Sequence, residues 1–276
     1  MNDASDIFTF ASEDGLLAYR DTGAGRPLVL LHGGYLDHTM WDDQVPVLAR
    51  HHRVIAPDAR GHGASANASR PFRQTDDLAA LLRHLGVGPA VLAGVSMGAT
   101  IAVDTALVHP DLVRALVISG GGTSAPELHD PWARDVQAAQ ARALAAGDIE
   151  GWIDGSALWA AGPHRTLDDI DPAVVRRLRE MARRTITKHT AAEPDHHRPV
   201  PDTATRAKEI TVPVLAVNGA LDTPDLAAIA ERIATTVPDG RITTIEGAAH
   251  MPTMEQPDAY NRILEDFLRT VYAEER

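Results

Sequence analysis

Residues 90–99 read AVLAGVSMGA, and this stretch decides the fold. A short apolar segment runs into a Gly-x-Ser-x-Gly turn centred on Ser96, and an Ala-rich helical pattern follows. The sequence therefore predicts a strand, a tight turn and a helix, with Ser96 presented at the apex of the turn as a candidate nucleophile. Gly94 and Gly98 are expected where any side chain would collide with the neighbouring strand and helix.

Further apolar segments that read as strands lie on both sides of this motif. They fall at about 28–31, 53–56, 113–119, 212–217 and 241–245, and a hairpin is expected from 7–11 and 16–20 around Asp14-Gly15. Because helical patterns alternate with these strands, we predict the α/β class, with a mostly parallel sheet covered by helices on both faces. Residues 124–209 lack the strand pattern and read as helices with Pro-rich breaks. The prediction is thus a core of residues 1–123 and 210–276 with a helical cap insertion at 124–209.

The composition argues against several kinds of protein. The 276 residues are 44% hydrophobic, which suits one large α/β domain, and the formal net charge of −12 argues against nucleic-acid binding. The absence of cysteine excludes a thiol nucleophile, disulfides and cysteine metal sites. The N-terminus lacks the pattern of a signal peptide, and the longest apolar stretch is too short to span a bilayer. We expect a cytoplasmic protein without membrane insertion.

The serine needs a general base, because its hydroxyl is a weak nucleophile at neutral pH. Among thirteen histidines, His250 combines a position after a predicted strand, a Gly/Ala-rich loop and a place late in the chain. Asp222 follows the preceding predicted strand and is expected to orient the imidazole, with Asp225 three residues further on as the alternative. The order Ser96, Asp222, His250 is the one expected for this sheet topology.

Acyl transfer also needs backbone N–H donors for the negative charge that develops on the carbonyl oxygen. We assign them to Met97, at the start of the predicted helix, and to Gly34, in the turn after the strand at 28–31. No metal site and no cofactor are expected, because the histidines at 189, 196 and 197 show no recognised ligand spacing.

Four motifs in the chain resemble those of the α/β-hydrolase fold family. They are His32-Gly33-Gly34 with Trp41 nine residues on, DARGHGAS at 58–65, the serine turn, and the loops that carry Asp222 and His250. The resemblance covers about 28–122 and 212–267, implies an eight-stranded sheet, and extends to residues 124–209 only through their placement, which is that of the family's cap. It also implies structural roles for Asp58, Arg60 and His62, with Arg60 bridging carbonyl groups or Asp58.

The motif set looks most similar to small bacterial esterases and enol-lactonases, and a serine nucleophile points away from the family's dehalogenases and epoxide hydrolases. We therefore predict a serine hydrolase that cleaves a carboxylic ester or lactone through an acyl-enzyme. Candidates for the substrate pocket are Tyr35, Trp152, Trp159 and Met251, although Trp132, Trp152, Trp159 and Phe72 could equally pack within the cap.

Three other functions stay open from the sequence. A C–C bond hydrolase of a β-diketone-like substrate could hold an acidic group with the cap arginines 176, 177, 179, 183 and 184. A cofactor-free perhydrolase of the haloperoxidase type could share the whole triad, and a ligand receptor could keep it for binding alone. The expected partner is a small-molecule ester or lactone, and a homodimer is left open.

Overall fold

The computed structural model describes residues 7–124, 128–190 and 192–273, which form one eight-stranded sheet. The strand order is β1-β2-β4-β3-β5-β6-β7-β8. β2 is antiparallel to β1 and β4, and the other neighbouring strands are parallel. The strands are β1 (Ile7–Ser12), β2 (Gly15–Gly23), β3 (Arg26–Leu31), β4 (His52–Pro57), β5 (Ala90–Val95), β6 (Val113–Ser119), β7 (Val214–Gly219) and β8 (Gly240–Ile245). The α/β class and the mostly parallel sheet predicted from the sequence are confirmed.

Helices cover both faces of the sheet because successive side chains of a strand point to opposite sides. Leu28 of β3 packs in one apolar layer and Val29 in the other, and neither is exposed to solvent. The first layer includes α1 (Val45–Leu48) and α10 (Pro257–Ala273); the second includes α2 (Gln74–His84), α3 (Met97–Val108) and α8 (Pro224–Thr236). With both faces buried, the central strands hold the loops at their ends in fixed positions.

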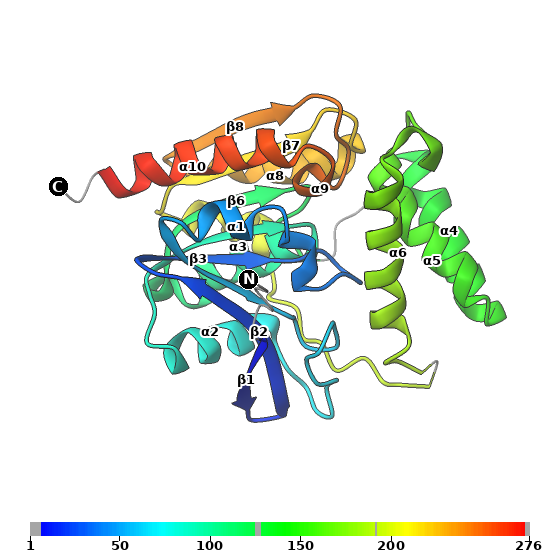
Figure 1. The fold of residues 1–276 in the computed structure, drawn as a ribbon, viewed down its shortest axis with the longest axis horizontal. Helices are drawn as coiled ribbons and strands as arrows, with labels where there is room; N and C mark the ends of the chain where they lie inside the picture. The colour runs from blue at the N-terminus through cyan, green and yellow to red at the C-terminus, as the bar shows by residue number, and fades with distance from the viewer. Residues whose placement is uncertain (1–6, 125–127, 191, 274–276) are drawn as a thin grey trace, which may run out of the picture.

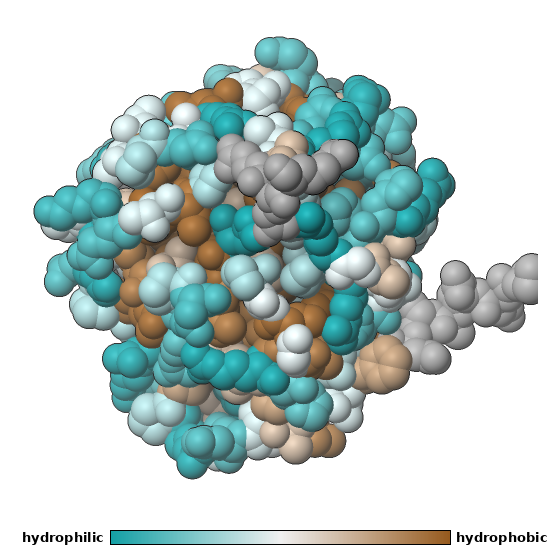
Figure 2. All heavy atoms as spheres, turned by 90° about the vertical axis from the view of Figure 1, so that its left-hand side faces the viewer, coloured by the Kyte–Doolittle hydropathy of each residue, from teal (hydrophilic) through white to brown (hydrophobic). Residues whose placement is uncertain are grey.

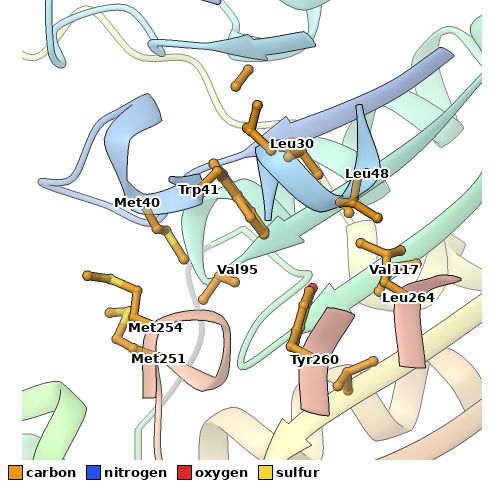
Figure 3. Packing of buried hydrophobic residues seen from close by; sticks show 14 of the residues in the cluster. Leu30, Met40, Trp41, Leu48, Val95, Val117, Met251, Met254, Tyr260 and Leu264 are labelled. Atoms are coloured by element: carbon orange, nitrogen blue, oxygen red, sulfur yellow. The ribbon is translucent and has the colours of Figure 1, made fainter. Parts of the chain in front are cut away.

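Figure 3 shows the first of these layers from close by. Trp41, at the end of the 3₁₀ helix η1 (His38–Trp41), lies next to Tyr260 of α10, with 6.2 Å between the ring centroids. Both side chains are fully buried, and burial of such rings contributes strongly to core stability. The segment after β3 is thereby attached to the C-terminal helix, although the two are far apart in sequence.

Residues 124–209 hold the helices α4 (Pro131–Ala146), α5 (Ile149–Ala161), α6 (Pro172–Ile186) and α7 (Thr203–Arg206). Figure 1 shows α4, α5 and α6 side by side, beyond the strand ends to which the arrows of β6 and β8 point. Local sequence sets where these three helices begin. In each case an aspartate accepts a backbone N–H of the first turn, namely Asp130, Asp148 and Asp171. The division of the chain into core and cap stays a prediction.

The side of the molecule opposite α4, α5 and α6 is the left-hand side of Figure 1, and it faces the viewer in Figure 2. Hydrophilic side chains spread over this face, with apolar residues between them. Within the described part of the chain, no helix has the length and apolar character needed to cross a membrane.

Candidate active site

Ser96 lies at the apex of the turn between β5 and α3 and has the backbone geometry of a strained elbow. Its φ of 55° and ψ of −115° are unusual for a residue with a side chain, and its N–H donates to the Ser119 carbonyl at 2.8 Å. A Cβ atom at Gly94 would overlap the Gly98 backbone, and one at Gly98 would overlap the Leu31 carbonyl. The two glycines therefore allow the close approach of strand and helix that presents Ser96, as predicted.

His250 and Asp222 form a buried pair beside this turn. The Nδ1 atom of His250 lies 2.9 Å from Oδ2 of Asp222, and the side chains are only 4% and 2% exposed. Burial by itself would lower the pKa of His250, but the negative charge and hydrogen bond of Asp222 outweigh it, so the pKa is raised. The alternative acid, Asp225, instead accepts the backbone N–H groups of His129 and Asp130.

The glycines after β6 pack closely against both Ser96 and His250. A Cβ atom at Gly120 would lie 2.7 Å from the His250 ring, and one at Gly121 would lie 2.7 Å from the Ser96 carbonyl oxygen. Only residues without side chains leave room here, and the run of three glycines after Ser119 was the signal in the sequence. Between the described residues no hydrogen bond joins the Ser96 hydroxyl to His250; in free enzymes such bonds are often long and tighten when substrate binds.

The turn after β3 lies over the elbow and brings Gly34 beside Met97. A Cβ atom at Gly34 would be 3.9 Å from the Met97 Cβ, and one at Gly33 would be 3.9 Å from the Ser96 Cβ. Met97 is the first residue of α3, so its N–H has no acceptor within the helix. His32 fixes the turn, because one ring nitrogen bonds the Gly33 carbonyl and the other accepts the Ala59 N–H.

One aromatic residue of α5 lies near the candidate triad, and another contacts the residue after Gly34. The Trp159 ring centroid lies 5.9 Å from that of His250, and Trp152 meets Tyr35 edge-on at 4.7 Å. Met251 differs from these, because it is buried in the core layer together with Met254 (Figure 3). Their predicted roles as pocket residues stay predictions.

The DARGHGAS segment has structural contacts, with one departure from expectation. Arg60 does not pair with Asp58: its guanidinium binds the Asp77 carboxylate at 2.7 Å and the Asp14 carbonyl. Asp58 is buried and accepts the N–H and the ring of His38, each at 2.8 Å. Of the two expected partners of Arg60, one carbonyl group is found and Asp58 is not. The Asp77 carboxylate takes the place of Asp58, because the sequence does not show where α2 docks.

Asp37, His38 and Asp58 are close enough together to be considered as metal ligands. The two carboxylates are already occupied by donors, however. The Asp37 carboxylate accepts hydrogen bonds from Thr39 and Arg184. The Asp58 carboxylate accepts hydrogen bonds from His38 and from the backbone N–H of Ala64. A cluster whose oxygens all accept hydrogen bonds fits a structural role better than a ligand set.

A cavity of about 470 Å³ meets the candidate site at Met97. It lies between α3, the loop after β4, and a wall formed by His189, Thr190 and residues of 193–200. Neither Ser96 nor His250 contributes to its wall. Asp104 of α3 lines it and is 5% exposed. Its carboxylate accepts the hydroxyls of Ser124 at 3.0 Å and Thr203 at 2.9 Å, close to the two ends of the predicted insertion. Burial raises the pKa of Asp104 to about 6 against these two hydrogen bonds.

Four of the five arginines of α6 form ion pairs with carboxylates. Two of them reach the segment around η1: Arg177 pairs with Asp43 at 2.6 Å, and Arg184 pairs with Asp37 at 2.8 Å. Two others pair within the predicted cap, Arg179 with Asp154 and Arg183 with Glu150. These contacts attach α6 to the loop that carries Gly34, a connection that the sequence did not reveal.

The geometry agrees with what comparison with known proteins finds. A model of the alpha/beta hydrolase family matches residues 28–263. The chain belongs to the alpha/beta hydrolase family. This α/β hydrolase is 31% identical to the pimeloyl-[acyl-carrier protein] methyl ester esterase of Aromatoleum aromaticum over 260 residues, covering 88% of this chain and 98% of the relative.

Two further matches to the α/β hydrolase span most of both chains. The 2-hydroxy-6-oxononadienedioate/2-hydroxy-6-oxononatrienedioate hydrolase of Cupriavidus pinatubonensis is 29% identical over 261 residues, which cover 90% of this chain and 89% of the relative. The solved structure of a thermophilic esterase from Thermogutta terrifontis has a TM-score of 0.77 and 26% identity, covering 97% of this chain and 99% of the other. The relatives are hydrolases, esterases among them.

Proposed function

We propose that this α/β hydrolase is a serine hydrolase that cleaves a carboxylic ester or a lactone through an acyl-enzyme. One observation carries the proposal: Ser96 stands on a left-handed backbone apex beside His250, whose ring is bonded to the buried Asp222 carboxylate. Similarity to two esterases, one by sequence and one by structure, supports an ester as the substrate.

The chemistry follows from the positions of these groups. Asp222 occupies Nδ1 of His250, which leaves Nε2 to take the proton of the Ser96 hydroxyl as its oxygen attacks the carbonyl carbon. The resulting oxyanion would accept the N–H groups of Gly34 and Met97. Collapse of this intermediate breaks the ester C–O bond, and His250 returns the proton to the leaving alkoxide. His250 then activates a water that releases the acid and restores Ser96. No step requires a metal or an organic cofactor.

The first experiment is Ser96→Ala assayed on p-nitrophenyl esters of increasing acyl length, together with labelling by a fluorophosphonate. We expect kcat/KM to fall by about 10³-fold or more and labelling to disappear, because loss of the nucleophile removes the acyl-enzyme route. Ser69→Ala is the matched control, since Ser69 is exposed and contacts Asp14 near the β1–β2 turn. Undiminished turnover in Ser96→Ala would refute the proposal.

Hydrolysis of a C–C bond is the second candidate, favoured by similarity to the Cupriavidus hydrolase. The contacts of α6 argue against it in the form expected from the sequence. Four of the five arginines considered for an acidic substrate already pair with carboxylates; they are Arg177, Arg179, Arg183 and Arg184. Activity on a β-diketone-like acid in place of the ester series would favour this candidate.

The remaining alternatives stay predictions and have distinct outcomes. A perhydrolase would show peroxide-dependent turnover that also needs Ser96, and a receptor would bind a ligand with slow single turnover and a persistent adduct. We also propose a small-molecule ester or lactone as the partner, and the cytoplasmic location remains a prediction.

A further inference from the structure

The Glu255 side chain binds the backbone of the loop that carries His250. Glu255 ends the short helix α9 (Pro252–Glu255), and its side chain is 3% exposed. Its Oε1 atom accepts the backbone N–H of Ala249 at 2.9 Å and that of Met251 at 3.3 Å. The same oxygen thus binds the residues immediately before and after His250, so rotation of this loop would break both bonds.

The other oxygen of Glu255 connects this loop to residues 124–209. Oε2 forms an ion pair with Arg165, which follows α5. Arg165 also donates to the carbonyls of Ala160 at 2.8 Å and Ala161 at 3.1 Å, at the C-terminus of α5, and to the Gly247 carbonyl at 3.0 Å. A guanidinium suits this place, because its fixed set of donors can serve a carboxylate and several carbonyls at once.

The end of α5 also contacts both loops of the His250–Asp222 pair. Gly162, the residue after α5, has a φ of 69°, and a Cβ atom there would overlap the carbonyl of Leu221 and lie 3.0 Å from the Cβ of Ala249. Trp159, one turn earlier, stacks obliquely on the His250 ring. One helix end therefore touches the loop before Asp222, the loop before His250 and the imidazole itself.

We infer that Glu255 is a positioning residue for His250 and that Arg165 couples this position to the docking of α5. The inference rests on the proposed role of His250 as general base. The two N–H bonds to Glu255 hold the imidazole between Asp222 and the Ser96 turn, and Arg165 holds the carboxylate. Displacement of α5 would release both the carboxylate and the Trp159 ring from the His250 loop.

The charges around His250 make this inference measurable. The carboxylates acting on the imidazole are Asp222, from the loop after β7, and Glu255, from α9, while α5 brings the neutral Trp159 ring. Arg165 is paired with Glu255 and acts to lower the pKa of that carboxyl. Because a positive charge disfavours a protonated imidazole, the Arg165 charge opposes that of Glu255 at His250. Loss of the Glu255 charge alone should therefore lower the pKa of His250, and loss of both Glu255 and Arg165 charges should restore part of it.

Glu255→Gln is the central variant because its amide oxygen still accepts the two N–H bonds while the charge is removed. We expect the acid limb of kcat/KM, which reports the general base of the free enzyme, to move to lower pH. In Glu255→Ala the N–H groups lose their acceptor, and we expect kcat to fall by about 10- to 100-fold with KM nearly unchanged. Glu209→Gln is the matched control, since Glu209 pairs with Arg206 on the surface away from His250.

A second readout does not depend on catalysis. The imidazole resonances of His250, assigned by their loss in His250→Gln, are titrated by NMR in the wild type, in Glu255→Gln and in the double variant with Arg165→Met. We expect a lower titration midpoint in Glu255→Gln and a partial return in the double variant. An NMR midpoint and an acid limb that both stay at their wild-type pH would overturn the inference, even if Glu255→Ala were inactive through unfolding. Activity retained in Ser96→Ala would instead refute the proposed function and leave the NMR result interpretable.

Discussion

Asp104 offers a direct test of how burial changes the pKa of a carboxyl group and, through it, the stability of this protein. The side chain lies on α3, almost wholly buried, and accepts hydroxyls from Ser124 and Thr203. Its pKa is raised from 3.8 to about 6, because loss of water outweighs the two hydrogen bonds. The perturbation is Asp104→Asn, which keeps the size of the side chain and can both accept from one hydroxyl and donate to the other.

The sign and size of the effect follow from linkage between protonation and folding. Because the pKa of Asp104 is higher in the folded chain than in the unfolded one, its contribution to stability is fully present below pH 3.8. That contribution is lost as the pH rises through about 6. At 1.36 kcal/mol per pKa unit, the loss above pH 7 amounts to about 3 kcal/mol. The neutral asparagine does not bear this cost, so the variant should be more stable than the wild type at pH 8, by at most that amount.

The assay is reversible urea unfolding of both proteins at intervals from pH 4 to pH 8. The free-energy difference between variant and wild type should increase between pH 4 and pH 6 and stay constant above pH 7. Asp111→Asn is the control, since the Asp111 side chain is 68% exposed, and its effect on the free energy of unfolding should be small. A difference for Asp104→Asn that is flat with pH, or that favours the wild type at pH 8, would refute the reasoning.

Three further predictions concern contacts that hold the site together. Arg184→Ala removes the guanidinium from a carboxylate that is 2% exposed, and we expect urea unfolding to show a loss of about 1–2 kcal/mol. Gly98→Ala forces a Cβ into the carbonyl of the neighbouring strand, and we expect a loss of more than about 3 kcal/mol or no folded protein by circular dichroism. Trp159→Ala removes the ring from His250, and steady-state kinetics should show a fall in kcat/KM with Ser96 still labelled by a fluorophosphonate.

Each of these has a control in the same chain. Arg183→Ala breaks a pair between exposed groups and should change stability by less than about 0.5 kcal/mol. Gly86→Ala meets no atom within 4 Å, so only its positive φ should cost stability, about 1 kcal/mol. Trp132→Ala removes a ring that meets Trp159 edge-on, and this variant should affect kcat/KM less than Trp159→Ala does. Reversal of any of these orders would contradict the contact on which it depends.

Local sequence was sufficient for the turn and the sheet. Ser96 was placed at an elbow because Gly94 and Gly98 are needed where strand and helix touch, and that constraint acts over five residues. The strands were found because fully buried parallel strands read as short apolar runs. The pairing of Asp222 with His250 could be predicted as well, because the ends of parallel strands meet at one edge of the sheet.

Contacts of residues 124–209 could not be predicted in the same way. Arg184 and Asp37 are 147 positions apart, and nothing near either residue identifies the other. The Arg165–Glu255 pair spans 90 positions, and each residue alone reads as an ordinary charge on a solvated surface. Asp104 is buried where Ser124 and Thr203, close to the two ends of the insertion, meet α3, and nothing beside it in the sequence shows that contact.

The sequence by itself determined the turn that presents Ser96, the order of the candidate triad residues and the parallel sheet, because short-range sterics and strand periodicity act between neighbours in the chain. Only the tertiary structure decided which charges on α6 and after α5 meet the core, and therefore what surrounds His250. Ion pairs of this kind depend on how one rigid element packs on another, and the free energy that selects the packing is distributed over the whole interface.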